Sequence, residues 1–291
     1  MTDIRRLLIV LWFVCVPASA AEDRASFWKV SSEQTSVYLL GSIHFANASF
    51  YPLRDVILEA FDDADRMSVE VVLDETAPQE YTSLLDRYGR YPRGETLRDH
   101  VSESTYQRLR TFLEDSGMPA TSMDSLRPGI IVMQLASMMM MQNGYTPEYG
   151  IDMRLMARAR ASGKPIDALE TIEQQIRLIA GLPHHDMVLA ETLDQLDEAA
   201  SIIDEMERAW KVGDDAAMLA LLITDPEGQY AGFEDVNEIL LYQRNRGMLE
   251  KISGYLKGDE QRFIVVGAAH LIGTEGLIEL LDEAGYEIER L

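Results

Sequence analysis

The chain has few of the residues on which several classes of protein depend. Only one of its 291 residues is cysteine, and only five are histidine. That cysteine, Cys15, falls in an N-terminal segment that we expect to be removed. The remaining protein would have no disulfide, no thiolate nucleophile and no cysteine-based zinc site. Its chemistry must therefore depend on histidine, carboxylates, hydroxyls or backbone groups.

Basic residues are also scarce, with 26 Lys and Arg against 49 Asp and Glu and a formal net charge of −23. A surface of this sign repels phosphate backbones and anionic lipid, so we expect no nucleic-acid partner. Long hydrophobic runs are missing too. The apolar stretch 129–141 is interrupted by Gln134 and is too short to cross a bilayer. We therefore expect no stable membrane span in the mature protein.

The first twenty residues have the form of a secretory signal peptide. Arg5 and Arg6 precede the apolar stretch Leu7–Val16, and Ala18–Ala20 supplies small residues for a cleavage site. An uncleaved anchor is the alternative, but this apolar stretch is too short to span a bilayer comfortably. We predict cleavage after Ala20 and a periplasmic or secreted protein.

The two ends of the chain alternate between strand-like and helix-like patterns. Strand patterns are found at residues 27–31, 36–41, 66–73, 261–267 and 286–291, and helical patterns at 53–65 and 275–284. Strand–helix–strand units of this kind favour a parallel sheet. We predict an α/β fold with a central, mostly parallel sheet built from both ends of the chain.

The segment between the two ends is almost wholly helical in pattern, from about residue 77 to residue 257. The exception is KPIDALE at 164–170, which resembles a short strand. No flexible or low-complexity linker separates the parts. We therefore expect one domain of residues 21–291, with the helical segment 77–257 as an insertion.

Two strand-like runs far apart in the chain end in the same way. Residues 38–44 read YLLGSIH and residues 264–270 read IVVGAAH, so a histidine follows each glycine by three residues. Ligands bind beyond the carboxyl ends of parallel strands, and glycine lets the backbone turn sharply there. We predict that His44 and His270 share one site. The alternative is that each histidine is simply bonded to nearby backbone.

Two carboxylates are candidates for the same edge of the sheet. Glu70 lies inside the apolar run 66–73, where a buried carboxylate is costly unless it is paired, protonated or bound to a metal. Glu170 lies where the strand 164–170 meets a helix. Glu70 on an exposed edge strand and Glu170 as an ordinary helix N-terminal acid are the alternatives.

A polar pair interrupts an apolar stripe on the predicted helix 239–256. Leu241, Met248 and Ile252 recur at helical spacing, and Asn245 completes their stripe with Arg244 at its edge. A buried amide needs partners. Either Asn245 bonds to neighbouring backbone with Arg244 in solvent, or both point into the cleft, where Arg244 could bind a carboxylate or stabilise an oxyanion.

Together these motifs resemble the TraB/GumN family over nearly the whole mature chain. The resemblance is carried by residues 38–44, Glu70, 149–152, 169–170, 244–245 and 266–281. The family is similar to the Tiki metalloproteases, which also carry paired GxxH motifs. The resemblance implies a centre of His44, Glu70 and His270 that binds Mn²⁺ or Co²⁺.

The resemblance also places other residues around this centre. It implies that Glu170, Arg244 and Asn245 line the centre. In the predicted reaction Glu170 could act as general base and Arg244 as oxyanion partner. We also expect Asn245, Asp152 and Tyr149 to contact the substrate.

The function predicted from these residues is hydrolysis of a peptide or ester bond by a metal-activated water. Two histidines and one carboxylate leave an open metal position for water, and Zn²⁺ also suits these ligands. One alternative is a metal-free site in which His44 is a general base beside Glu70. Another is a periplasmic binding protein for a peptide, haem or saccharide. The run Met138–Met141 is then either a buried helix face or an adaptable groove wall.

Overall fold

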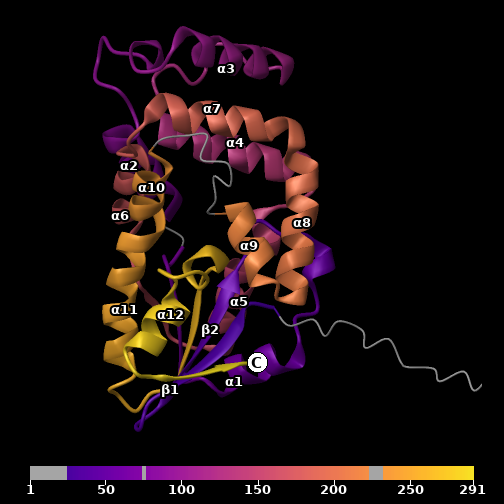
Figure 1. The fold of residues 1–291 in the computed structure, drawn as a ribbon, viewed down its shortest axis with the longest axis vertical. Helices are drawn as coiled ribbons and strands as arrows, with labels where there is room; N and C mark the ends of the chain where they lie inside the picture. The colour runs from indigo at the N-terminus through magenta and orange to yellow at the C-terminus, as the bar shows by residue number, and fades with distance from the viewer. Residues whose placement is uncertain (1–24, 74–76, 223–231) are drawn as a thin grey trace, which may run out of the picture.

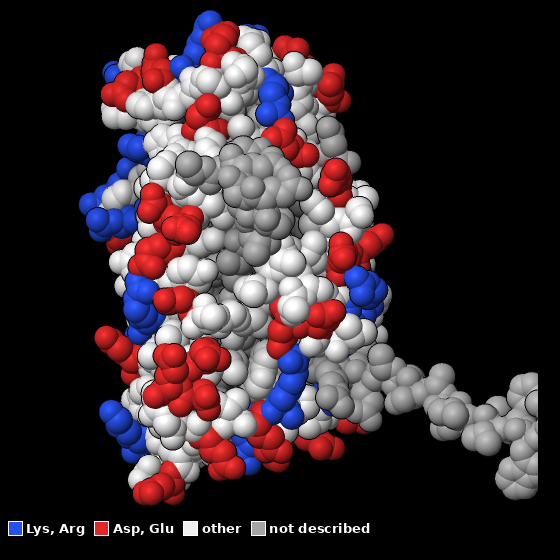
Figure 2. All heavy atoms as spheres, in the orientation of Figure 1, with Lys and Arg blue, Asp and Glu red and all other residues white. Residues whose placement is uncertain are grey.

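The structure is a computed structural model that describes residues 25–73, 77–222 and 232–291 (Figure 1). The predicted signal peptide lies outside the described residues. In the described part of the chain no helix is long and apolar enough to cross a membrane. Acidic side chains are spread over the face in Figure 2 and outnumber basic ones there, as the composition indicates.

One six-stranded sheet organises the fold, with the strand order β4-β3-β5-β2-β1-β6. The strands are β1 (Phe27–Ser31), β2 (Ser36–Ser42), β3 (Arg66–Val69), β4 (Ile166–Ala168), β5 (Arg262–Gly267) and β6 (Glu287–Arg290). The pairs β4–β3, β3–β5 and β5–β2 are parallel, whereas β1 is antiparallel to both β2 and β6. The predicted α/β class and mostly parallel sheet are confirmed.

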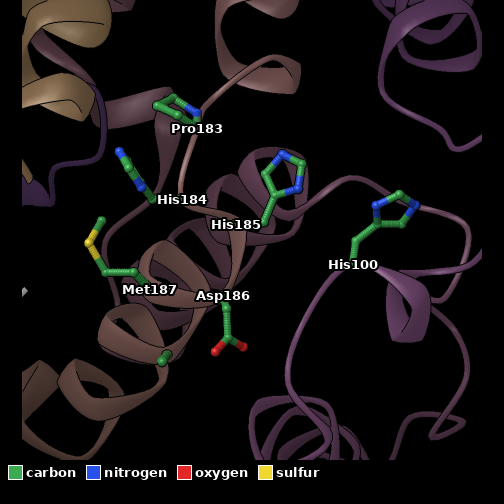
Figure 3. Close-up of a pocket in the computed structure, with 7 residues that line it drawn as sticks. His100, Pro183, His184, His185, Asp186 and Met187 are labelled. Carbon is green, nitrogen blue, oxygen red and sulfur yellow. The ribbon is translucent and has the colours of Figure 1, made fainter. Parts of the chain in front are cut away.

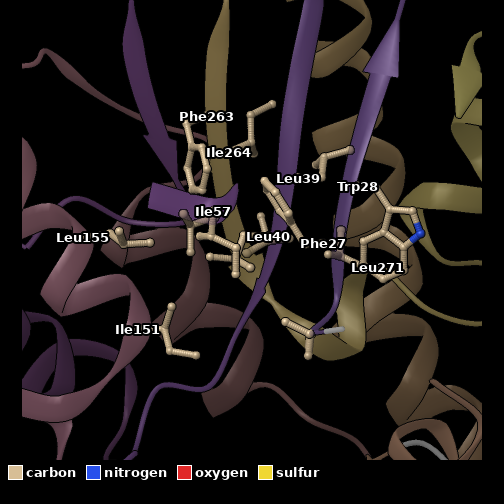
Figure 4. Close-up of a cluster of buried hydrophobic side chains, with 14 of the residues drawn as sticks. Phe27, Trp28, Leu39, Leu40, Ile57, Ile151, Leu155, Phe263, Ile264 and Leu271 are labelled. Carbon is tan, nitrogen blue, oxygen red and sulfur yellow. The ribbon is translucent and has the colours of Figure 1, made fainter. Parts of the chain in front are cut away.

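The middle of the sheet is apolar on both faces because helices cover both. Phe263, Ile264, Val265 and Val266 of β5 are all buried, which is typical of a central parallel strand. Figure 4 shows side chains of β1, β2 and β5 packing with Ile57 of α1 and with residues of α5. This packing fixes the ends of β2 and β5 relative to each other.

Two strands are shorter than the sequence pattern predicts. The pattern at 66–73 continues past Val69, but β3 ends there and Glu70 follows it. The Glu70 carboxylate accepts the backbone N–H of Gly267 on the neighbouring strand. Similarly β4 covers only part of 164–170, and the N–H of Glu170 donates to the Glu70 carbonyl at 2.7 Å. Both glutamates thus lie just beyond the sheet.

Helices supply the layers around the sheet and the predicted insertion. They are α1 (Asp55–Asp63), α2 (Ala77–Tyr88), α3 (Glu103–Asp115), α4 (Pro128–Gln142), α5 (Ile151–Ser162), α6 (Ile172–Ala180), α7 (His185–Gln195), α8 (Ala199–Val212), α9 (Asp215–Leu222), α10 (Phe233–Asn237), α11 (Gln243–Tyr255) and α12 (Leu277–Glu283). A π-helical turn, Glu238–Tyr242, joins α10 to α11. In Figure 1, α3, α4 and α7 lie at the end of the molecule away from the sheet strands β1 and β2.

Helix α4 lies between two hydrophobic cores, which explains its run of methionines. Met138 packs with the core formed by α3, α4 and α7, whereas Met139 and Met140 pack against the core of the sheet. Met141 is 51% exposed. The unbranched thioether side chain adapts to such irregular surroundings. The expected buried helix face is therefore wrong, because Met138, Met139 and Met140 are only half-buried and Met141 is exposed.

Candidate active site

The carboxyl edge of the sheet brings the predicted site residues together. Glu170 follows β4, Glu70 follows β3, His270 follows β5 and His44 follows β2, so the four lie in the order of their strands. Loops at this edge of a parallel sheet are the usual place for a ligand. The two histidines are 226 positions apart in the sequence, and the parallel pairing of β2 with β5 brings them to the same edge of the sheet.

His270 is buried and its ring orientation is fixed. Its Nδ1 lies 2.6 Å from Oδ1 of Asn245, and the Asn245 amide donates to the Glu275 carbonyl at 2.7 Å. The amide nitrogen is therefore used, so the amide oxygen accepts the Nδ1–H of His270. Nε2 then faces Oε1 of Glu70 at 3.8 Å. Burial lowers the pKa of His270 to about 4, which keeps the ring neutral at neutral pH.

His44 is held in a similar way but is open to solvent. Its Nδ1 lies 3.2 Å from Asp152 on the first turn of α5, and the hydroxyl of Ser42 donates to the same carboxylate at 3.0 Å. Its Nε2 lies 4.0 Å from Oε1 of Glu70, and the side chain is 53% exposed. Partial burial lowers the pKa of His44, but the carboxylates of Asp152 and Glu70 raise it by more, so that it lies above its ordinary value.

Glu70 is the carboxylate that both rings approach. Its Oε1 accepts the backbone N–H of Gly267 at 2.6 Å, while its Oε2 accepts from Arg244 at 2.5 Å and from Gln175 at 3.1 Å. Burial raises the pKa of Glu70, but the histidines, Arg244 and the Gly267 N–H lower it by more, to about 2. Glu70 is therefore an ionised carboxylate with a fixed orientation.

Arg244 joins the two glutamates. Its Nε lies 3.0 Å from both oxygens of Glu170, and its Nη2 lies 2.6 Å from one of them. Gln175 on α6 donates to Glu170 as well as to Glu70, at 3.1 Å. All three charged side chains are at most 14% exposed. Of the two roles predicted for Arg244, the structure shows the binding of carboxylates.

The three residues predicted to contact the substrate do not lie together in the structure. Asn245 and Asp152 hold the two histidine rings as described above. Tyr149 lies in a 3-10 turn before α5, and its carbonyl accepts from the Tyr51 hydroxyl at 2.6 Å. The guanidinium of Arg154 lies 4.7 Å from the centre of the Tyr149 ring. Tyr149 is thus part of an aromatic cluster rather than a partner of the histidines.

For three residues of the cluster the sequence did not predict the contacts that they make, although Ser42 and Gly267 lie within the GxxH runs. Gln175 stands on a helix among other polar residues, and Ser42 looks like the end of a strand. Gly267 is the glycine of the second GxxH run, where the sequence predicts a sharp turn. A Cβ on Gly267 would lie 3.3 Å from Oε1 of Glu70 and 3.5 Å from Nε2 of His44, so the glycine also leaves room for the cluster. These roles depend on tertiary contacts and have no local pattern.

The other three histidines line a separate surface pocket of about 710 Å³. Figure 3 shows His185 and His100 on neighbouring elements, and their ring centres are 6.3 Å apart. His100 bonds Glu95 at 3.0 Å and stacks on Tyr91, while His184 bonds Asp235 at 2.8 Å. None of these contacts involves the carboxyl edge of the sheet. The pocket is therefore distinct from the candidate active site.

The candidate site has the types of donor atom that bind divalent metals, namely imidazole nitrogens and a carboxylate oxygen. Each histidine has Nδ1 engaged and Nε2 directed at one ionised carboxylate, which is how metal-binding histidines are usually held. Two ligands of one ion, each about 2.1 Å from it, lie at most about 4.2 Å apart. The pairs at 3.8 and 4.0 Å approach that limit. As the side chains lie, no group of three or more His, Cys, Asp or Glu in the described part of the chain has metal-site geometry.

Fold and site together define an α/β protein with a histidine and carboxylate cluster at the carboxyl edge of a mostly parallel sheet. The chain belongs to the TraB/PrgY/gumN family, which matches residues 26–290. The resemblance drawn from the sequence motifs is confirmed.

Two kinds of relative are similar to the chain. YbaP of Escherichia coli K12 is 28% identical over 246 residues, which cover 84% of this chain and 87% of YbaP. The metalloprotease TIKI2 of Xenopus tropicalis is 24% identical over 94% of this chain, and a TIKI homologue of Amphimedon queenslandica is 22% identical over 93%. The chain spans 61% and 62% of the length of these two metalloproteases.

Proposed function

We propose that this protein is a metal-dependent hydrolase that cleaves a peptide or ester bond. The observation that carries the proposal is the pair of Nε2 atoms facing one oxygen of the ionised Glu70. The similarity to proteins named metalloproteases supports the same reaction class. The proposal extends to a peptide or small-molecule substrate that binds at the carboxyl edge of the sheet.

His44, Glu70 and His270 are the residues that would hold the metal. When bound, Mn²⁺, Co²⁺ or Zn²⁺ would lower the pKa of a water molecule and polarise a carbonyl group. Asp152 and Asn245 orient the two rings and keep both Nε2 atoms turned to Glu70. The proposed metal site therefore requires no histidine besides His44 and His270.

The residues around Glu70 keep its carboxylate ionised and fixed. The Glu70 carboxylate accepts hydrogen bonds from Arg244, Gln175 and the Gly267 N–H. These bonds hold the carboxylate in one orientation in the presence of solvent. Glu170 shares Arg244 with Glu70 and, as the predicted general base, would accept a proton beside the reacting bond. The open side of the site is at His44, whose side chain is half exposed.

We further propose that the protein works in the periplasm or outside the cell. The charged start, apolar stretch and small-residue site in residues 1–20 support export. The high acidic charge is compatible with either place. Mass spectrometry of the protein purified from a Gram-negative host tests this, because export predicts a mature N-terminus at Ala21.

A metal-free hydrolase is the second candidate. The contact of His44 with Asp152, at 3.2 Å, resembles the histidine–aspartate pair of serine hydrolases, in which the carboxylate orients the ring. In that case Glu70 would balance an imidazolium formed during the reaction. A cleft that binds a peptide, haem or saccharide without turnover is the outcome if neither activity is found.

Hydrolysis with and without metal separates these candidates. The purified protein is treated with chelator, and quenched fluorescent peptides and p-nitrophenyl esters are then supplied with Mn²⁺, Co²⁺, Zn²⁺ or no metal. We expect turnover only with added metal, and loss of turnover when chelator returns. Turnover unaffected by chelator would instead support the metal-free site.

Replacing Asn245 with leucine is expected to weaken metal binding about 10–100-fold, which is typical when the partner of a ligand histidine is lost. The reason is that His270 would lose the acceptor of its Nδ1–H and with it its fixed orientation. The measurement is a metal titration of both proteins. Equal affinities would contradict the assigned role of Asn245.

Replacing Gly267 with alanine is expected to reduce kcat/KM about 10–100-fold, because small displacements of reacting groups have effects of this size. The new methyl group would push the Glu70 carboxylate away from the Gly267 N–H. Gly254→Ala is the matched control, since a Cβ there meets nothing within 4 Å. Equal rates for both variants would show that the carboxylate tolerates the shift.

A further inference from the structure

The five histidines of the chain fall into two groups, and the second group lies in the surface pocket of about 710 Å³. His100 follows the 3-10 turn Leu97–Asp99, and His184 and His185 lie at the start of α7. The candidate active site uses none of these three side chains. The pocket therefore gathers three of the five histidines in a place where the proposed reaction gives them no role.

His100 and His185 are the two histidines of this pocket that face each other. Figure 3 shows a nitrogen of each ring on the side of the other ring, whereas the side chain of His184 points away from both. The ring centres of His100 and His185 are 6.3 Å apart, and the ring planes meet at 73°. These two side chains can therefore contact one small ligand between them, and His184 lies outside the pair.

Each of the two rings is held through one nitrogen. Nε2 of His100 lies 3.0 Å from Glu95, whereas its Nδ1 makes no hydrogen bond within the described residues. The Leu182 carbonyl accepts a hydrogen bond from the His185 ring. Burial lowers the pKa of His185, so this ring is neutral at neutral pH and its second nitrogen carries a lone pair. A histidine with one nitrogen bonded and the other open is the usual arrangement of a metal ligand.

The spacing of the rings fits two ligands on opposite sides of one ion. An imidazole nitrogen lies about 2.1 Å from a bound metal and its ring centre about 1.2 Å further away, so two ring centres are roughly 5.3 Å apart at a tetrahedral angle and about 6.5 Å apart in line. The observed 6.3 Å is close to the second value. Ligands on opposite sides are typical of tetragonal Cu²⁺ and Ni²⁺, whereas Zn²⁺ prefers a tetrahedral site.

A buried hydroxyl beside His100 is a second sign of a polar ligand. The Tyr91 hydroxyl is buried and has no hydrogen-bond partner in the described part of the chain. Buried polar atoms are nearly always bonded to protein or to ordered water. The Tyr91 ring stacks on the His100 ring, with ring centres 4.1 Å apart. A water molecule bound to an ion at His100 would supply a partner next to these stacked rings.

The charges that border the pocket suit a cation. Glu95 and Asp235 bond histidines of the pocket, and Asp186 lines it. Against these three carboxylates, the guanidinium of Arg127 lies 5.1 Å from the centre of the Tyr91 ring. With the histidines neutral, the carboxylates would balance a divalent ion rather than repel it.

We propose that His100 and His185 bind one divalent ion from the late first-row transition metals, Cu²⁺ or Ni²⁺, with water in the remaining positions. The ion would join the segment before α3 to the start of α7, since the two histidines are 85 positions apart in the sequence. This site is separate from the edge of the sheet and takes no part in the proposed hydrolysis. Affinity for nitrogen ligands rises from Mn²⁺ to Cu²⁺, so Mn²⁺ should leave the pair empty and report on the edge of the sheet alone.

Calorimetric titration with Ni²⁺ tests the proposal in a protein that lacks both histidines of the candidate active site. The His44→Ala/His270→Ala double variant is purified without a histidine tag, treated with chelator, and titrated with Ni²⁺ and with Mn²⁺. We expect it to bind one Ni²⁺ per chain and no Mn²⁺. Ni²⁺ at about 100 times its Kd should also raise the Tm by several degrees, because the ion binds the folded protein.

Further replacements in this double variant identify the ligands. Losing the partner that orients a ligand histidine usually weakens metal binding 10–100-fold, so losing the ligand itself should weaken Ni²⁺ binding at least about tenfold. We expect this for His100→Gln and for His185→Gln, in which glutamine keeps a polar side chain of similar size. His184→Gln is the matched control, because His184 lines the same pocket and bonds a carboxylate but points away from the pair. It should leave Ni²⁺ binding unchanged, and circular dichroism checks that each variant is folded.

Electron paramagnetic resonance of bound Cu²⁺ provides a second readout. The double variant should show splitting from two imidazole nitrogens, and His100→Gln should reduce this to one. The proposal would be overturned if the double variant bound neither Ni²⁺ nor Cu²⁺, if binding survived either His100→Gln or His185→Gln, or if His184→Gln weakened it equally. Because the histidines of the candidate active site are absent throughout, none of these outcomes depends on the proposed hydrolysis.

Discussion

Replacing Arg244 with methionine is expected to lower the free energy of unfolding by about 3–5 kcal/mol, the usual cost of removing one partner from a buried ion pair. The guanidinium is 14% exposed and is shared by Glu70 and Glu170, which are 9% and 11% exposed. Without it, two carboxylates would remain close together with only Gln175 between them. Urea unfolding followed by circular dichroism measures the change.

Two further variants show whether charge is the cause. Arg246→Met removes an arginine two positions away on the same helix, whose side chain is 48% exposed and pairs with Glu238 and Glu275. Exposed pairs contribute about 1 kcal/mol or less, so this control should change little. Neutralising both glutamates as Gln in the Arg244→Met background should restore much of the loss. A small effect of Arg244→Met alone would contradict the buried network.

Replacing either His44 or His270 with alanine is expected to reduce kcat/KM by about 10³-fold or more. In the proposed reaction a metal held by His44, Glu70 and His270 would activate water, and each histidine would supply one of the three ligands. Losing one ligand should remove both the water activation and the polarised carbonyl. Steady-state hydrolysis of the best peptide or ester, with metal in excess, gives the ratio.

His100→Ala is the matched control for these variants. His100 is also a histidine bonded to a carboxylate, but it lies in the surface pocket rather than at the sheet edge. Its loss should leave kcat/KM within about twofold of the unchanged protein. If His44→Ala and His270→Ala behaved like this control, the site assignment would be wrong.

The matched GxxH runs made much of this site predictable from the sequence. Parallel pairing brings the ends of β2 and β5 together, so two histidines at the same offset after a glycine reach the same edge. Asn245 was also recognisable, because a polar residue on an apolar helical stripe needs a buried partner. The structure provides that partner as the Nδ1–H of His270.

Other features could not be read from local patterns. Apolar residues continue after Val69, so the sequence predicts a longer β3, but the strand ends at Val69 and the Glu70 carboxylate accepts the N–H of Gly267. Gln175 takes part only because α6 faces both glutamates. The pairing of Arg244 with Glu70 joins residues 174 positions apart, and no periodicity predicts such a contact. Tertiary packing alone determines these three features.

Titration of the chelator-treated protein with Mn²⁺, Co²⁺ and Zn²⁺ in a calorimeter tests the central claim most directly, because it requires no knowledge of the substrate. The unchanged protein should bind one ion per chain with at least one of these metals. His44→Ala and His270→Ala should each lose that binding, whereas His100→Ala should keep it. Absence of binding, or binding that both site variants retain, would contradict a shared metal site at the carboxyl edge of the sheet.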